Sequence, residues 1–397
     1  MPSTNLAFRN RIGSIDLLRG IIMVIMALDH VRDFFHTQSF VEDPLSLRTT
    51  TPWLYFTRWI THFCAPNFVF LAGVSAFLIG LRKDKKALSV FLVKRGFWLI
   101  LVEVFIVTLF ITFDPLYHIF VLQVIWAIGA SMVIMGLVVR LPYKWIFIIG
   151  ASLVLFHNLL DYPEQARNYQ VGFFWNMMHS GHDGPSFFNN SRGIVLIYPL
   201  IPWPGIMMLG YCAGKLFTPD FGVERRRKWL LGLGGGMIAM FMILRLINAY
   251  GDPQAWASQR DTLHSFFSFM NVQKYPPSLM FFCATVGPAL IALALLEGIK
   301  NKLTDFFTVF GRVPFFYYVV HFFVIHLLAV IIFFVEGYGK KDILPNGTPF
   351  LFRPLHFGFG LAGVYIIWVG LILFLYPICK WYNKYKSTHS QWWLSYL

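Results

Sequence analysis

Charged residues are scarce in this sequence. Asp, Glu, Lys and Arg make up 13% of its 397 residues, whereas 57% of the residues are hydrophobic. A soluble globular domain carries about 25% charged residues, so this balance excludes an ordinary water-soluble fold. The sequence predicts an all-α protein, a polytopic transmembrane helical bundle that occupies residues 1–397 as a single domain.

Cysteine is also scarce, and its spacing indicates no site. Cys64, Cys212, Cys283 and Cys379 lie in separate apolar runs, and no two of them have CxxC spacing. Neither a disulfide framework nor a zinc centre is therefore indicated. The first apolar run continues into charged residues and not into a small-residue cleavage site, so we expect no cleavable signal peptide.

Ten apolar runs are long enough, or nearly so, to cross about 30 Å of hydrocarbon. They cover residues 14–32, 57–81, 90–112, 118–139, 144–160, 194–218, 229–249, 277–298, 314–336 and 357–380. We expect about ten spans, with 11 as the alternative, because the fifth run is short and prolines interrupt the sixth.

The net charge of +14 follows the expected topology. Basic clusters at residues 82–86 and 225–228 lie in loops on the side of the N-terminus, as the positive-inside rule requires of cytoplasmic loops. We therefore expect both termini in the cytoplasm and no nucleic-acid partner. The long segments 33–56, 161–193 and 250–276 then form ordered loops at the outer face.

Ionisable residues gather at both ends of the first run. The inner end carries Asp16 and Arg19, and the outer end carries Asp29, His30, Arg32, Asp33 and His36. Arg19 and His30 share a helix face at a distance of about 16 Å along the axis. If the helix persists, Asp29, Arg32 and His36 share a neighbouring face.

Such an outer cluster suits a general base that a carboxylate orients. The structural alternatives are a helix-dipole contact for Asp16, an inner-interface position for Arg19, and an interfacial ion-pair cluster that ends the helix.

The first run also resembles a known family. The pattern Arg11-IG-Ser14-I-Asp16-LL-Arg19-Gly20 is similar to the start of the heparan-α-glucosaminide N-acetyltransferase family. The resemblance continues in PNFVFLAGVS (66–75), in Leu122-Gln123 and in GRVPFFYYVVH (311–321). The segments YPLIPWPGIMMLGYCAGK and KYPPSLMFF resemble the bacterial branch in particular.

This resemblance implies a membrane acyltransferase. It would move an acyl group, acetyl in the family, from cytosolic acetyl-CoA to a hydroxyl or amine of a sugar or lipid-linked envelope acceptor. The reaction would take place at the outer face of the bacterial inner membrane. The family's polar asparagine falls at His30, and His36 is the nearest counterpart of its catalytic histidine.

The candidate roles follow from the resemblance and from the chemistry of acyl transfer. Either His30 or His36 is the base or a transient acyl carrier, and Asp29 or Asp33 orients it. The remaining candidates for binding the substrate or CoA are Asp16, Arg19, Arg32, Asn67, Gln123 and, as a reserve histidine, His321.

A transporter of a small polar or anionic solute is the alternative, because prolines also break transporter helices. The enzyme is favoured, since the polar residues gather at one end of the bundle and no inverted repeat is visible. No metal is expected: His179-SG-His182-Asp183 is typical of a polar loop. Ser75 follows Gly73 but lacks the second glycine of a nucleophile elbow, because Phe77 stands at that position, and it is interpreted as a packing residue.

Overall fold

The structure is a computed structural model that describes residues 12–181, 185–189, 191–344, 350–391 and 394. Its longer helices are α1 (Gly13–Phe35), α3 (Cys64–Gly80), α4 (Lys85–Val102), α6 (Val124–Val138), α7 (Tyr143–Phe156), α10 (Trp203–Ala213), α11 (Val223–Ile247), α13 (Leu279–Leu296), α14 (Lys302–Arg312), α15 (Pro314–Val335) and α16 (Leu361–Thr388). Shorter helices are α2 (Pro52–Ile60), α5 (Thr108–Thr112), α8 (Asp161–Ala166), α9 (Phe173–Met178) and α12 (Thr262–Met270).

Polar side chains mark where several helices begin. Asp84 accepts a hydrogen bond from the backbone N–H of Ala87 at the start of α4, and Ser278 accepts one from Phe281 at the start of α13. Asn301 and Thr304 form a reciprocal capping box at the start of α14. Each cap satisfies backbone donors that have no partner within the helix.

Six helical segments of the described chain are long and apolar enough to cross a membrane. They are Pro52–Gly80, Tyr143–Ala166, Val223–Ile247, Leu279–Leu296, Pro314–Val335 and Leu361–Thr388. The helical membrane protein predicted from the sequence is thereby confirmed, whereas the expected count of about ten spans is not.

A small sheet departs from the all-α prediction. Strands β1 (Ile119–Leu122), β2 (Ser186–Asn189) and β3 (Arg192–Leu196) form it in the order β1-β3-β2, with β1 parallel and β2 antiparallel to β3. Two expected spans, 118–139 and 194–218, thus begin as strands. The second becomes helical only at Trp203, because Pro199 and Pro202 cannot donate backbone hydrogen bonds.

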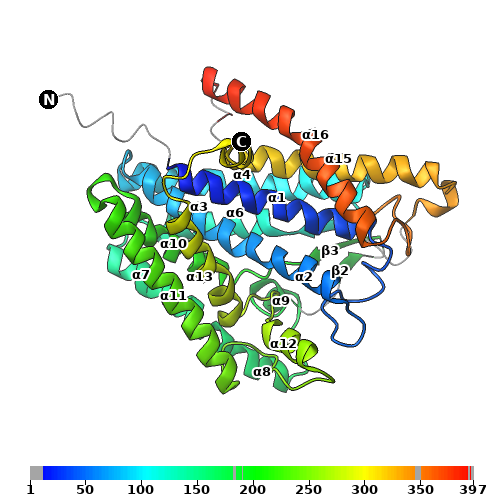
Figure 1. The fold of residues 1–397 in the computed structure, drawn as a ribbon, viewed down its shortest axis with the longest axis horizontal. Coiled ribbons are helices and arrows are strands. Elements are labelled where there is room, and N and C mark those ends of the chain that lie inside the picture. The colour runs from blue at the N-terminus through cyan, green and yellow to red at the C-terminus, as the bar shows by residue number, and fades with distance from the viewer. Residues whose placement is uncertain (1–11, 182–184, 190, 345–349, 392–393, 395–397) are drawn as a thin grey trace.

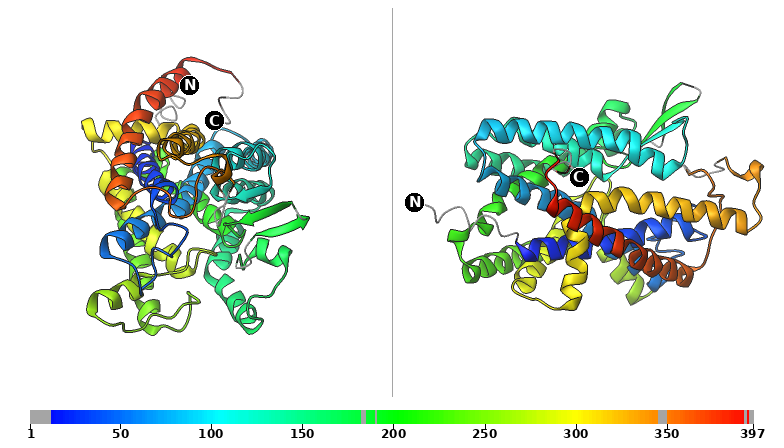
Figure 2. Two further views of the ribbon diagram at one scale, coloured as in Figure 1. Left: turned by 90° about the vertical axis from the view of Figure 1, so that its right-hand side faces the viewer. Right: turned by 90° about the horizontal axis from the view of Figure 1, so that it is seen from above.

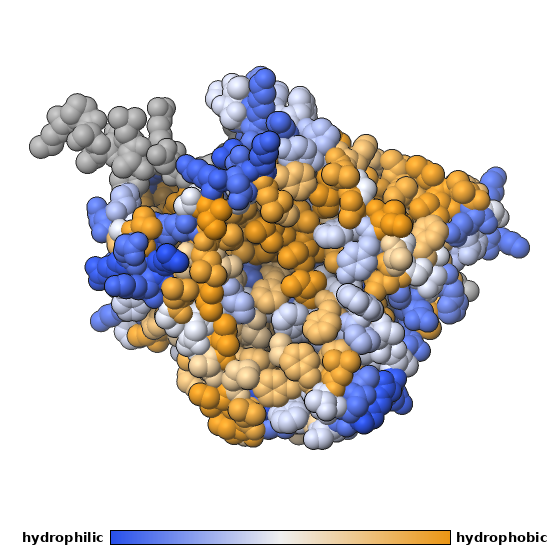
Figure 3. All heavy atoms as spheres, viewed as in Figure 1, coloured by the Kyte–Doolittle hydropathy of each residue, from blue (hydrophilic) through white to orange (hydrophobic). Residues whose placement is uncertain are grey.

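Helix α1 lies in the interior of the bundle. It contacts α3, α13, α14, α15 and α16 (Figure 1). Figure 2 shows it enclosed by other helices when the bundle is seen end-on. Ionisable residues on α1 are therefore held inside the protein. Hydrophobic side chains cover much of the face seen in Figure 3, and hydrophilic ones gather towards the edges of that face, as expected of a lipid-facing protein.

Two glycines let α1 and α14 approach closely. A Cβ atom on Gly311 would lie 1.7 Å from the carbonyl oxygen of Asp16, and one on Gly20 would lie 1.9 Å from that of Phe307. Backbone atoms cannot rotate away as a side chain could. The helix crossing therefore requires glycine at both positions.

We predict that Gly311→Ala destabilises the detergent-solubilised protein by about 1–3 kcal/mol, the usual cost of overpacking. Gly235→Ala is the matched control, because a Cβ there meets nothing within 4 Å. Alanine should leave stability unchanged at that position or raise it, because alanine favours helix. Thermal unfolding measures both variants, and a Gly311→Ala melting temperature equal to that of the wild type would contradict the packing described.

Candidate active site

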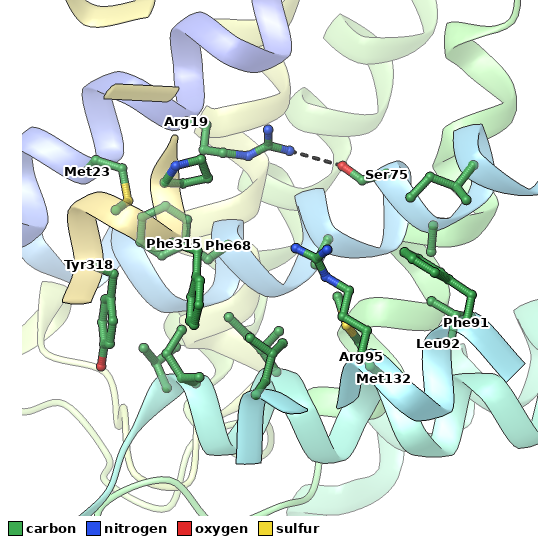
Figure 4. A pocket seen from close by; sticks show the side chains of 18 residues that line it. Arg19, Met23, Phe68, Ser75, Phe91, Leu92, Arg95, Met132, Phe315 and Tyr318 are labelled. Atoms are coloured by element: carbon green, nitrogen blue, oxygen red, sulfur yellow. Dashed lines mark hydrogen bonds between the residues drawn. The ribbon is translucent and has the colours of Figure 1, made fainter. Parts of the chain in front are cut away.

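The inner end of α1 is joined to α3 by a hydrogen bond. Arg19 donates from Nη2 to the Ser75 hydroxyl at 3.0 Å, and its Nη1 lies 3.4 Å from an Asp16 carboxylate oxygen (Figure 4). Nε of Arg312 lies 4.0 Å from the other Asp16 oxygen. Arg19 is thus anchored between helices, and Ser75 does more than fill space.

An inner cavity of about 230 Å³ opens beside Arg19, between α1, α3, α4, α6 and α15. Its lining is mainly apolar and includes Met23, Phe68 and Phe315. Figure 4 shows the guanidinium groups of Arg19 and Arg95 among these apolar side chains. The cavity therefore combines a hydrophobic wall with two fixed positive charges.

At the outer end of α1, the Asp29 carboxylate meets three cations. Arg58 donates to both of its oxygens, at 2.8 and 2.6 Å, and Arg32 donates to Oδ1 at 3.0 Å. The Lys274 ammonium lies 3.8 Å from Oδ2. Arg32 also donates to Asp33 at 2.7 Å. Asp29 is buried, so this pairing compensates a charge that would otherwise be costly to desolvate.

Sequence reasoning missed Arg58 and Lys274. They lie in other segments, on α2 and just before α13, and reach Asp29 only through the tertiary fold. A signal was present for each of them. Arg58 stands near the outer end of the second apolar run, and Lys274 begins the segment KYPPSLMFF that carries the family resemblance.

A second buried arginine shapes the segment that carries Lys274. Arg245 of α11 donates to the backbone carbonyls of Gln254, Ser268, Phe269 and Asn271 at 2.6–2.9 Å. Asp252 accepts hydrogen bonds from Ser278 and from the backbone of Gln273 in the same segment. Burial raises the pKa of the Asp252 carboxyl. These contacts fix the chain on either side of Lys274.

An outer cavity of about 90 Å³ lies against this ion cluster. Asp29, His30, Asp33 and Gln123 line it, together with Arg58, Lys274, Tyr198 and Tyr275. Phe68 and Val124 line both cavities. On α1, Met23 faces the inner cavity and Met26 the outer one, so the two cavities follow one another along the helix.

His30 lies between the ion cluster and a second histidine. Its Nδ1 is 3.9 Å from an Asp33 oxygen, and its ring packs against His321 and Phe322 at centroid distances of 5.3 and 4.3 Å. His321 is fully buried and directs Nδ1 at the carbonyl oxygens of Tyr317 and Tyr318. His321 lines neither cavity, so its contact with the cavity passes through His30.

His36 and Asn67 lie outside both cavity linings. Helix α1 ends at Phe35, and the extended backbone of His36 removes it from the helical face expected to hold Asp29 and Arg32. Arg353 donates to the His36 carbonyl at 2.8 Å. The Asn67 side chain donates to the carbonyls of Phe63 and Thr285, which ties α3 to α13.

Gln123 is placed by a residue that sequence reasoning also missed. The backbone N–H of Gln123 donates to Glu103 at 2.6 Å, and Glu103 is fully buried. Glu103 begins a π-helical segment, Glu103–Val107, between α4 and α5. Such segments are frequent at functional sites. An ionisable residue within the third apolar run was the available signal.

Among the described residues, one group of side chains could hold a metal ion: Asp161, Glu164 and His179. None of the three lines either cavity. Of the loop pattern considered from sequence, His182 and Asp183 lie outside the described residues.

Asp29→Asn tests the ion cluster. The neutral amide leaves Arg58 and Lys274 without their carboxylate, and loss of one partner from a buried pair costs about 3–5 kcal/mol. The melting temperature should fall well below that of Asp220→Asn, a control at an exposed position. Equal melting temperatures would show that Asp29 is not the centre of the cluster.

Comparison with known proteins agrees with the resemblance noted in the sequence. The model of the family described as heparan-alpha-glucosaminide N-acetyltransferase, catalytic, matches residues 11–244, more than half of the chain. A search of curated proteins found no match. The matched region contains Arg19, Asp29, His30 and Gln123 but ends before Lys274 and His321. The chain therefore belongs to the heparan-alpha-glucosaminide N-acetyltransferase family, a family of membrane N-acetyltransferases.

Proposed function

We propose that this protein transfers an acetyl group from cytosolic acetyl-CoA to a hydroxyl or amine of a sugar or other envelope acceptor. The transfer takes place at the outer end of α1, with His30 as the base. One observation carries the proposal: His30 and Asp29 line an outer cavity that shares Phe68 and Val124 with the Arg-bearing cavity at the inner end of the same helix. Family membership supports an enzyme over the transporter considered from sequence.

The inner cavity suits the donor. CoA combines an anionic nucleotide with a thin, largely apolar pantetheine arm, and the cavity offers Arg19 and Arg95 within an apolar wall. Charge-assisted hydrogen bonds from arginine are well suited to phosphate and polar amide oxygens. Arg19 and His30 are about 16 Å apart along α1, so an extended arm between them brings the thioester towards the outer cavity.

The outer cavity suits the chemistry. His30 takes the proton of the acceptor N–H or O–H, the acceptor atom attacks the thioester carbonyl carbon, and the C–S bond breaks. The proton then passes from His30 to the departing CoA sulfur, which leaves as a thiol. Direct transfer and transfer through an acyl-His30 intermediate use the same side chains.

The residues around His30 have distinct parts in this reaction. Arg58, Lys274 and Gln123 line the outer cavity and are the proposed hydrogen-bond donors to the developing oxyanion. Asp33, whose Oδ2 lies 3.9 Å from Nδ1 of His30, is the carboxylate proposed to orient the imidazole ring. Asp29 holds the cations in place. The charged cluster thus positions donors before the reaction begins, which is the arrangement that lowers an acyl-transfer barrier.

The proposed orientation follows the charge pattern. Ile79 and Phe91, which stand on either side of the basic cluster at residues 82–86, line the inner cavity, whereas Lys274, from the segment expected outside, lines the outer cavity. We infer a protein of the bacterial inner membrane whose two termini are cytoplasmic. Its partners are acetyl-CoA inside and a sugar or lipid-linked acceptor outside.

The proposal predicts unequal effects at the two histidines. His30→Ala should lower transfer from radiolabelled acetyl-CoA to an envelope extract by about 10²–10⁴-fold, the usual contribution of a general base. His36→Ala should leave the rate within about threefold, because His36 lines neither cavity. Full activity in His30→Ala, or a collapse of activity in His36→Ala alone, contradicts the assignment of the base.

The proposal also predicts where CoA binds. Arg19→Met and Arg95→Met should each weaken CoA binding about 10–100-fold, because each removes a charge-assisted hydrogen bond worth about 1.5–3 kcal/mol. Arg192→Met, at an exposed position on β3, is the control and should bind CoA as the wild type does. Calorimetry on folded, solubilised protein measures the affinities. If both Arg19→Met and Arg95→Met bound CoA as tightly as the wild type, the proposal that CoA binds in the inner cavity would be contradicted.

A further inference from the structure

A second polar cluster lies apart from both cavities. It joins the end of α7 to α8 and α9, the short helices of the segment expected at the outer face (Figure 1). His157, Asp161, Glu164 and His179 compose it, and all four are buried. Nothing in the proposed acetyl transfer uses these residues.

The cluster buries two carboxylates without a basic partner. Within the described chain, neither Asp161 nor Glu164 pairs with a lysine or arginine, and the only ion pair that Glu164 forms is with His179, at 2.8 Å. Ligand atoms of Asp161, Glu164 and His179 all lie within 4.8 Å of one another. Two neighbouring carboxylates in a buried setting require a proton or a cation to offset their charge.

The hydrogen bonds of the cluster leave one carboxylate oxygen, Oε2 of Glu164, available to a ligand. Oε1 of Glu164 accepts from the Trp175 indole at 2.6 Å and faces His179, whereas the buried Oε2 accepts no hydrogen bond from any described residue. The Asn158 amide donates to Asp161 at 2.7 Å. Partners of this kind orient the ligands of metal sites.

The two imidazoles extend the arrangement. Nε2 of His179 lies 3.2 Å from Nδ1 of His157, so the pair shares one proton between these atoms. If a metal takes Nδ1 of His179, His157 accepts a hydrogen bond from Nε2–H and fixes the tautomer. A histidine that ligates a metal through one nitrogen regularly donates from the other.

We propose that Asp161, Glu164 and His179 bind a divalent transition-metal ion of the zinc class. Imidazole nitrogen and carboxylate oxygen are both zinc ligands in proteins, with bond lengths of about 2.0–2.2 Å. Ligand atoms around one such ion lie about 3.4 Å apart, so side-chain movements of about 1 Å close the site.

The site would fasten the outer segment to the bundle. Asp161 and Glu164 lie on α8 and His179 directly follows α9, so one ion crosslinks both short helices. Asn158 links the site to α13, because its Oδ1 accepts a hydrogen bond from the backbone N–H of Leu279 at 2.9 Å. The proposed metal site therefore has a structural role, and this role is independent of the proposed acetyl transfer.

Metal analysis and thermal unfolding of the solubilised full chain test the proposal, with Zn²⁺ alone as the probe. After removal of metal with a chelator and reloading, the wild type should retain about one zinc per chain and melt at a higher temperature than the chelated form. Glu164→Gln and His179→Gln should retain no zinc and melt near the chelated wild type whether or not Zn²⁺ is added.

His264→Gln is the matched control. His264 also pairs with one carboxylate, Asp261 at 2.8 Å, but it belongs to no group that could hold a metal among the described residues. This variant should keep both the zinc and its stabilising effect. A wild type that retains no zinc and gains no stability from it overturns the proposal, as does zinc that persists in both Glu164→Gln and His179→Gln.

Discussion

The pairing of the Asp29 carboxylate with Arg58, Arg32 and Lys274 is the interaction on which the rest of the site depends. These cations come from α2, α1 and the segment before α13, so one buried carboxylate draws three parts of the chain together. A buried charge is tolerated only when it is well paired, so the contacts must form together. His30 follows Asp29 in the chain, and this assembly holds it against the outer cavity.

Helix α1 connects the two ends of the proposed reaction path, with Arg19 at its inner end and His30 near its outer end. Its interior position lets it carry ionisable residues at both ends without exposing them to lipid, and the two cavities beside it share Phe68 and Val124. Arg19 and His30 lie about 16 Å apart on one helix. The proposed separation of the donor site from the proposed base therefore follows from helix geometry.

Local patterns in the sequence were sufficient for part of this site. The charge at both ends of the first run, the shared face of Arg19 and His30, and the membrane bundle could all be predicted, because helical periodicity and hydrophobic length are local properties. Arg58, Lys274 and Glu103 could not, since they reach the site through contacts between distant segments. The expected face of Asp29, Arg32 and His36 required the helix to continue past Phe35. The strands β1 and β3 could not be predicted, because a short apolar stretch is compatible with a buried strand as well as with a helix.

The most direct measurement is a cryo-electron microscopy structure with a non-hydrolysable thioether analogue of acetyl-CoA. The account predicts density for the pantetheine arm in the inner cavity between Arg19 and Arg95, and the acetyl group beyond Phe68 within reach of the His30 ring. CoA bound elsewhere on the protein, or an acetyl group remote from His30, would contradict the proposed path and the proposed base together.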